Sequence, residues 1–118
     1  MTWTVARGDL IEIIARDRGG RKPDIQEVVA HLRPGNRSTR QPDPDADPAA
    51  VFVITDRPAI GADDVEGWWL RIVPSVSNAI APGFYLVDFR MIFGADDERT
   101  TRPVPIEITE PATVYSDG

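Results

Sequence analysis

The chain has 118 residues, a formal net charge of −6 and no cysteine. Its length is that of one domain covering residues 1–118, and its lack of thiols excludes disulfides and zinc sites built on cysteine. An acidic chain does not offer the clustered lysine and arginine that phosphate contacts need, so we expect no nucleic-acid partner. No apolar run approaches the roughly 20 residues of a membrane-spanning helix, so we expect no membrane partner either.

Short apolar segments, punctuated by 11 prolines and 9 glycines, predict β-strands along the whole chain. In chain order, the expected strands cover residues 3–5, 10–16, 26–33, 50–55, 68–73, 84–93 and 102–109. Seven short strands in about a hundred residues predict an all-β fold, a single immunoglobulin-like antiparallel β-sandwich of about seven strands. No cysteine pair supports a true immunoglobulin domain.

The connections between the expected strands differ in length and composition. Residues 34–48 are polar, rich in proline and long for a connection inside a small domain, which predicts a mobile loop. Residues 114–118 are expected to form a short C-terminal tail. The Arg-Gly-Asp tripeptide at 7–9 lies between two apolar runs, so we interpret Gly8 as a bend before the second strand and not as part of an adhesion motif.

Histidine and cysteine, two residue types common in catalytic and metal sites, are nearly absent from this sequence. His31 is the single histidine and is expected on the surface, and no nucleophile elbow or phosphate-cradling glycine loop accompanies it. The segment DPDADP at 43–48 resembles the start of a calcium loop, but Pro48 stands where the loop needs glycine and Ile54 where it needs glutamate. We therefore predict no catalytic residue, no metal site, no cofactor and no enzymatic activity.

The segment GFYLVDFRMIFG at 83–94 is apolar on both sides, because Phe84, Leu86 and Ile92 alternate with a second apolar set. If the strands near 52–54, 68–73 and 84–92 are neighbours in one sheet, its inner face takes Trp68, Leu70, Ile72, Tyr85, Val87 and Phe89. Its outer face then collects Trp69, Val73, Phe84, Leu86 and Ile92. An apolar outer face of this kind predicts a protein interface. The equal alternative is that the loop after Arg33 or a chain terminus folds back and covers this face.

Two segments together resemble a known family. They are TVARGDLIEIIARDRGGRKPDIQEVVAHLRP at 4–34 and EGWWLRIVPSVSNAIAPGFYLVDFRMIFGADDERTTRPVPIEITEPAT at 66–113. Their order and spacing resemble small bacteriophage and prophage structural proteins: the N-terminal immunoglobulin-like domain of baseplate upper proteins, and small virion proteins associated with tail fibres or head spikes. The resemblance covers residues 4–113.

This resemblance implies a non-enzymatic structural component of a phage or phage-like particle. Such a component would be a tail, baseplate or fibre adaptor, or a head spike or decoration protein. Its partners would be other virion structural proteins, with copies of the chain forming a homo-oligomer or ring. Its location would be the virion, assembled in the cytoplasm of a bacterial host. The alternative from another class is an immunoglobulin-like module that binds carbohydrate or a receptor through an exposed Trp69 and neighbouring loops, and a small hydrolase is a weaker third.

Overall fold

The computed structural model describes residues 2–101 and 103–111 of the protein. Within these residues the chain forms ten β-strands, one short α-helix and one 3-10 turn, so the predicted all-β fold is confirmed. The elements are β1 (Trp3–Ala6), β2 (Ile11–Arg16), η1 (Lys22–Asp24), β3 (Glu27–Asn36), β4 (Gln41–Pro42), β5 (Ala50–Val51), β6 (Val53–Arg57), β7 (Gly67–Ile72), α1 (Pro74–Ser77), β8 (Gly83–Gly94), β9 (Asp97–Thr100) and β10 (Val104–Thr109).

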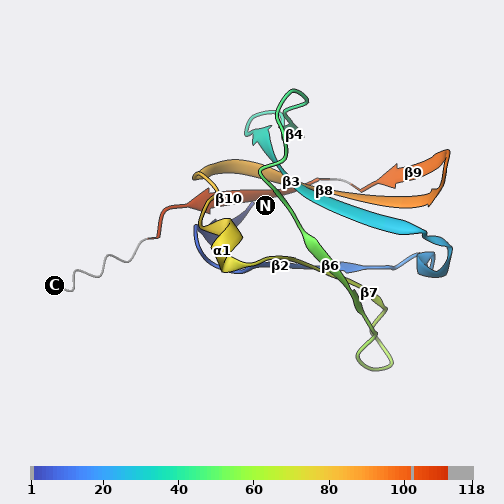
Figure 1. Cartoon of the computed structure of the whole chain (residues 1–118). Helices are drawn as coiled ribbons and strands as arrows, with labels where there is room; N and C mark the ends of the chain where they lie inside the picture. The colour runs from blue at the N-terminus through green and yellow to red at the C-terminus, as the bar shows by residue number, and fades with distance from the viewer. Residues whose placement is uncertain (1, 102, 112–118) are drawn as a thin grey trace.

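The strands form two sheets that face each other as a sandwich (Figure 1). In the described part of the chain, the large sheet has the order β1-β10-β8-β3-β4, with β5 also on β3 and β9 also on β8. The small sheet has the order β2-β7-β6. This is an immunoglobulin-like arrangement, in which β3, β8 and β10 correspond to strands C, F and G and the small sheet to strands B, E and D.

The position of β1 corrects the predicted purely antiparallel sandwich. β1 runs parallel to β10, with Trp3 opposite Ile106 and Ala6 opposite Thr109, so the large sheet is mixed. Gly8 has a φ of +94°, and this bend carries the chain from β1 in the large sheet to β2 in the small one. In immunoglobulin domains of the constant type a further strand, A, pairs with strand B. No described segment takes that place beside β2.

The described strands outnumber the seven that we expected, because β4 and β5 are only two residues long and β9 lies in the expected hairpin loop. Alternation cannot be recognised in segments this short. Part of the region 34–48 that we predicted as a mobile loop is a hairpin in which Asn36 pairs with Gln41 and Gly35 with Pro42. The predicted tail at 114–118 lies outside the described residues.

The core consists of the inner faces of both sheets. It contains Val5, Ile11, Ala30, Leu32, Phe52, Trp68, Leu70, Ile72, Ile80, Tyr85, Val87, Phe89, Ile106 and Ile108. All six residues that alternation assigned to the inner face are therefore in the core. At one end of the core, the hydroxyl of Tyr85 donates a hydrogen bond to the carbonyl of Ala81 at 2.6 Å, as in the tyrosine corner of immunoglobulin domains. Burial raises the pKa of this hydroxyl.

The expectation that strands near 52–54, 68–73 and 84–92 share one sheet is wrong. β7 pairs with β2 and β6 in the small sheet, whereas β8 pairs with β3, β9 and β10 in the large one. Trp69 and Leu86 therefore face away from each other on opposite outer faces of the sandwich. Alternation indicates which residues of a strand share a face, but it does not indicate which strands are neighbours.

Candidate functional site

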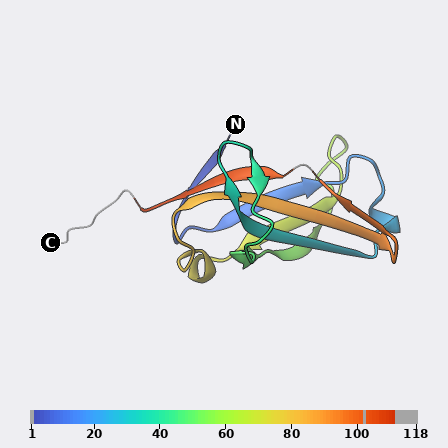
Figure 2. The same ribbon diagram turned by 90° about the horizontal axis from the view of Figure 1, so that it is seen from above.

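The β3–β4 hairpin covers the apolar outer residues at the start of β8. In Figure 2 the hairpin crosses β8 and β10 on the outer side of the large sheet. Leu86 is fully buried, and a side chain at Gly35 would bring its Cβ within 2.6 Å of Leu86 Cδ1. The guanidinium of Arg37 lies 5.4 Å from the centre of the Phe84 ring and pairs with Glu107 on β10. Of the two alternatives, an interface or a covering loop, the structure therefore shows the covering loop for Phe84 and Leu86.

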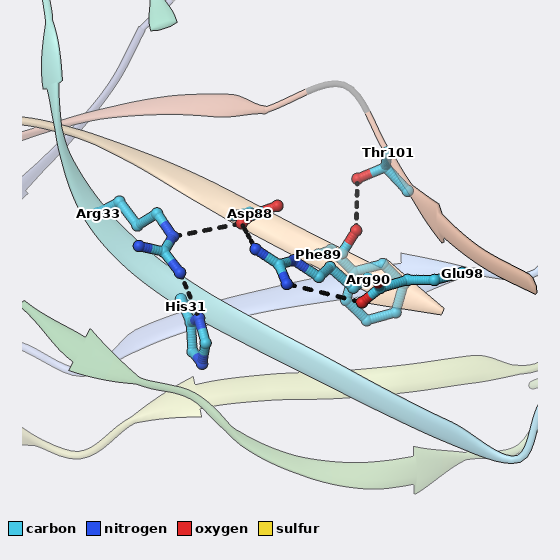
Figure 3. A network of polar contacts seen from close by, with 7 residues as sticks. All are labelled: His31, Arg33, Asp88, Phe89, Arg90, Glu98 and Thr101. Atoms are coloured by element: carbon cyan, nitrogen blue, oxygen red, sulfur yellow. Dashed lines mark hydrogen bonds and ion pairs between the residues drawn. The ribbon is translucent and has the colours of Figure 1, made fainter. Parts of the chain in front are cut away.

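A network of charged side chains occupies the middle of the same outer face (Figure 3). The carboxylate of Asp88 accepts hydrogen bonds from Arg33 Nε and Arg90 Nη2, both at 3.3 Å. Arg90 also pairs with Glu98 on β9 at 3.6 Å. Asp88 is buried, so the two guanidiniums supply the charge compensation that a buried carboxylate requires. The network joins β3, β8 and β9.

His31 lies at one end of this network, with its Nδ1 3.1 Å from Arg33 Nη2. Partial burial and the positive charges of Arg33 and Arg90 lower the pKa of His31, and Asp88 opposes them only in part. The imidazole is therefore neutral at pH 7. Its polar neighbour is a guanidinium and not a hydroxyl nucleophile, so its geometry is not that of a catalytic triad.

Trp69 lies on the outer face of the small sheet, in register with Ile14 on β2 and Thr55 on β6. The guanidiniums of Arg71 and Arg57 lie 4.7 and 5.5 Å from the ring centroids of Trp69. Arg57 is buried and held in place by an ion pair of 2.8 Å with Asp64 and a hydrogen bond to the carbonyl of Val65.

The carboxylate of Asp64 accepts hydrogen bonds from the amide of Ile60 and from Arg57, which hold its pKa well below the usual range. This ion pair fixes the guanidinium that packs on Trp69, so the tryptophan ring is partly covered by its own chain.

The other two residues of the predicted interface are separate from these. Val73 follows β7 directly and is exposed, whereas Ile92 is half-buried near the far end of β8, opposite Glu27 and Glu98. The five predicted residues thus occupy four different environments, and the fold does not assemble them into one patch.

An apolar cleft of about 520 Å³ opens between β2 and the β8–β9 side of the large sheet. Its floor includes the core residues Trp68, Leu70, Val87 and Phe89. Its walls include Ile13 and Ala15 of β2, and Met91 and Phe93 of β8, all of which are only half-buried. The cleft forms because β1 pairs with residues 106–109 of β10 and does not extend to this end of the sandwich.

The rim of this cleft is rich in arginine although the whole chain is acidic, and Asp17 lies among the arginines. Arg16, Arg18, Arg21 and Arg99 line the opening. The guanidiniums of Arg21 and Arg99 lie 4.7 and 5.2 Å from the centre of the Phe93 ring. The sequence does not reveal this cleft. Apolar residues alternate along β2 and β8 in the same way where the two sheets are closed and where the cleft opens between them.

The backbone of β2 is a second feature of the same opening. β2 pairs with β7 from Ile11 opposite Ile72 to Arg16 opposite Gly67, and no other described strand pairs with it. The amide of Asp17 donates to the carbonyl of Glu66 at 2.9 Å. Because hydrogen bonding alternates along an antiparallel ladder, the amides and carbonyls of Glu12, Ile14 and Arg16 point away from β7. The structure thus brings an apolar cleft and an unpaired strand edge together.

The described residues form neither a cluster of three metal ligands nor a membrane-spanning helix. Residues 2–101 and 103–111 contain no group of three or more histidine, aspartate or glutamate side chains that could hold a metal ion. In the calcium-like segment, the carboxylate of Asp43 accepts a hydrogen bond from the amide of Asp45 at 3.0 Å. The same residues form no helix long and apolar enough to cross a bilayer. No protein-family model matches the sequence, and no curated protein shows significant similarity to it.

Proposed function

We propose that this protein is a non-enzymatic structural component of a phage or phage-like particle, either a tail, baseplate or fibre adaptor or a head spike or decoration protein. The assignment to a particle is based on the resemblance of residues 4–34 and 66–113 to phage structural proteins. The observation that supports a role in assembly is the open side of the sandwich, where the edge of β2 that no described strand pairs with lies beside an apolar cleft. An extended segment or a second sheet satisfies both features at once.

The alternative of a carbohydrate-binding module receives no support from the surroundings of Trp69. A sugar stacks on an uncovered aromatic face, whereas two guanidiniums already lie over this ring. One of them, Arg57, is buried and fixed by Asp64, so moving it aside would remove the ion-pair partner of a buried guanidinium.

The proposal is tested by asking whether the protein is part of a particle. Particles would be induced from a strain that carries the gene, purified on a density gradient and analysed by quantitative mass spectrometry. We expect the full chain to co-sediment with the particles at a fixed ratio to their major structural proteins. Recovery of the protein solely in the soluble fraction, at the level of unrelated cytoplasmic proteins, would contradict the proposal.

A further inference from the structure

The exposed edge of β2 has a sequence that is complementary to itself. The residues whose backbone groups point outward are Glu12, Ile14 and Arg16, so an acidic, an apolar and a basic side chain follow one another at alternate positions. Reversing the direction of this triplet exchanges the two charges and leaves the isoleucine in the middle. An antiparallel second copy of the same strand is therefore its electrostatic complement.

We propose that two copies of the chain pair through β2, antiparallel and about a two-fold axis at Ile14. In this arrangement Ile14 is opposite Ile14 of the second copy, and Glu12 is opposite Arg16 in both directions. Three directly opposite pairs then use the outward-pointing amides and carbonyls, which is the pattern of hydrogen-bonded pairs in an antiparallel ladder.

Alternative registers of the same edge are less favourable. In a continuous sheet with both cores on the same side, inner residues must stay opposite inner residues. The residue opposite Ile14 can therefore change only in steps of two. The neighbouring shift in one direction places Glu12 opposite Ile14, and the shift in the other places Arg16 opposite Ile14. Larger shifts place Glu12 opposite Glu12 or Arg16 opposite Arg16, which is repulsive. The register centred on Ile14 is the one that opposes unlike charges.

Contacts within each chain extend this charge pattern. Glu12 already pairs with Arg71 on β7 at 2.5 Å, and Arg16 with Asp64 at 3.4 Å. In the paired arrangement the order across the junction is Arg71, Glu12, Arg16 of the second copy and Asp64 of the second copy. The signs alternate throughout, so the second copy adds to the existing ion pairs and does not replace them.

The apolar cleft supplies the second reason for this partner. Pairing doubles the small sheet and places Ile13 of one copy opposite Ala15 of the other on the inner face, where both residues line the cleft. It also covers Leu10, which is exposed just before β2 begins. The second copy thus occupies the position beside β2 that strand A takes in constant-type immunoglobulin domains. Such an isologous contact closes after two copies.

This inference deepens the proposed assembly role by naming a second copy as the partner of the open side. Dimerisation is measured on the purified chain, whereas the proposed function is measured on particles. A monomeric protein found in particles contradicts the dimer alone, and a dimer absent from particles contradicts the particle assignment alone.

The first experiment exchanges the charges. Sedimentation velocity of the purified full chain should give twice the protomer mass of 13.0 kDa. Glu12→Arg places arginine against Arg16, and Arg16→Glu places glutamate against Glu12, so each variant alone should raise the dimer dissociation constant at least about tenfold. Mixing the two variants in equal amounts should restore a dimer, because each then meets its complement. Native mass spectrometry distinguishes this heterodimer from either homodimer.

A matched control tests whether the same charge reversal outside the proposed interface also weakens the dimer. Glu98→Arg makes the same change on β9 of the large sheet and also removes an ion pair, so it should leave the dimer dissociation constant unchanged. Circular dichroism establishes that each variant is folded. A wild-type chain that stays monomeric at about 0.5 mM, or a mixture that fails to recover the dimer, would overturn the proposal.

A second experiment uses the absence of native cysteine and does not depend on charge. Directly opposite residues in a hydrogen-bonded pair have Cα atoms about 5.5 Å apart, which a disulfide can bridge. Under mild oxidation, Ile14→Cys should form a cross-linked dimer on a non-reducing gel. Glu12→Cys and Arg16→Cys should each remain largely uncross-linked, and their mixture should cross-link. Equal cross-linking of all three single variants would show that the register is wrong.

Discussion

The outer face of β8 and the open edge of β2 both present apolar residues, but the part of the chain that the structure describes covers only the first. On the large sheet, the apolar outer residues Phe84 and Leu86 are covered by the β3–β4 hairpin of the same chain. On the small sheet, β2 pairs with β7 on one side, but within the described residues no strand pairs with its other edge, and an apolar cleft opens there. The comparison shows that apolar residues outside the core predict that something packs on them. Whether this is a segment of the same chain or a partner depends on the surrounding chain segments.

The largest expected effect separates the buried floor of the cleft from its half-buried wall. Phe89 is buried and packs against Trp68 with ring centroids 5.6 Å apart, so Phe89→Ala should lower the free energy of unfolding by about 3–5 kcal/mol. Phe93 lies four residues along the same face, but it is a half-buried residue of the cleft wall, whereas Phe89 lies in the buried floor. Phe93→Ala should cost about 1 kcal/mol, because it widens an existing opening and creates no enclosed cavity. Equal losses in urea melts would show that the cleft is closed in solution.

The next effect tests whether the hairpin covers the large sheet. A methyl group at Gly35 would approach Leu86 Cδ1 to 2.6 Å and the carbonyl oxygen of Gln41 to 3.2 Å. Gly35→Ala should therefore destabilise the protein by about 1–3 kcal/mol through overpacking. Gly94→Ala is the matched control, since no atom lies within 4 Å of its Cβ position. If both variants melt at the same denaturant concentration, the hairpin does not pack on Leu86.

A smaller effect concerns the exposed side of the same cover. Arg37 is largely exposed while it pairs with Glu107 and stacks on Phe84. Exposed ion pairs and stacked guanidiniums contribute little to stability, so Arg37→Ala should lower the urea midpoint only slightly, and by less than Gly35→Ala. The ionic part of this loss should shrink in 1 M salt, which urea melts at two salt concentrations measure. A loss as large as that of Gly35→Ala would mean that Arg37 is buried.

The smallest effect is a pH dependence at the network beside the hairpin. The pKa of His31 is lowered in the folded protein, chiefly by partial burial and then by Arg33 and Arg90. Between the lowered pKa and the ordinary value near 6.5, the unfolded chain binds more protons than the folded one. The contribution of His31 to stability is therefore complete above about pH 6.5 and is lost as the pH falls below that value.

Urea midpoints at pH 7.5 and 5.5 measure this contribution, with His31→Gln as the comparison because glutamine can still accept a hydrogen bond from Arg33. We expect the wild type to lose more stability than the variant on acidification. A variant that loses as much as the wild type would show that His31 titrates normally.

The sequence by itself determined the all-β class and the inner faces of the strands. Alternation with a period of two is a local property of a strand, so Trp68, Leu70 and Val87 could be assigned to the core before any strand pairing was known. It also indicated the bend at Gly8, because glycine is the residue that adopts a positive φ without steric cost.

Only the tertiary structure decided which strands are neighbours and what covers them. Trp69 and Leu86 have the same pattern in the sequence, yet β7 and β8 belong to different sheets. The cover over Leu86 depends on a hairpin whose β4 is two residues long, and the opening beside β2 depends on β1 joining β10 in the other sheet. These outcomes follow from contacts between residues far apart in the chain, and a pattern within one strand carries no information about them.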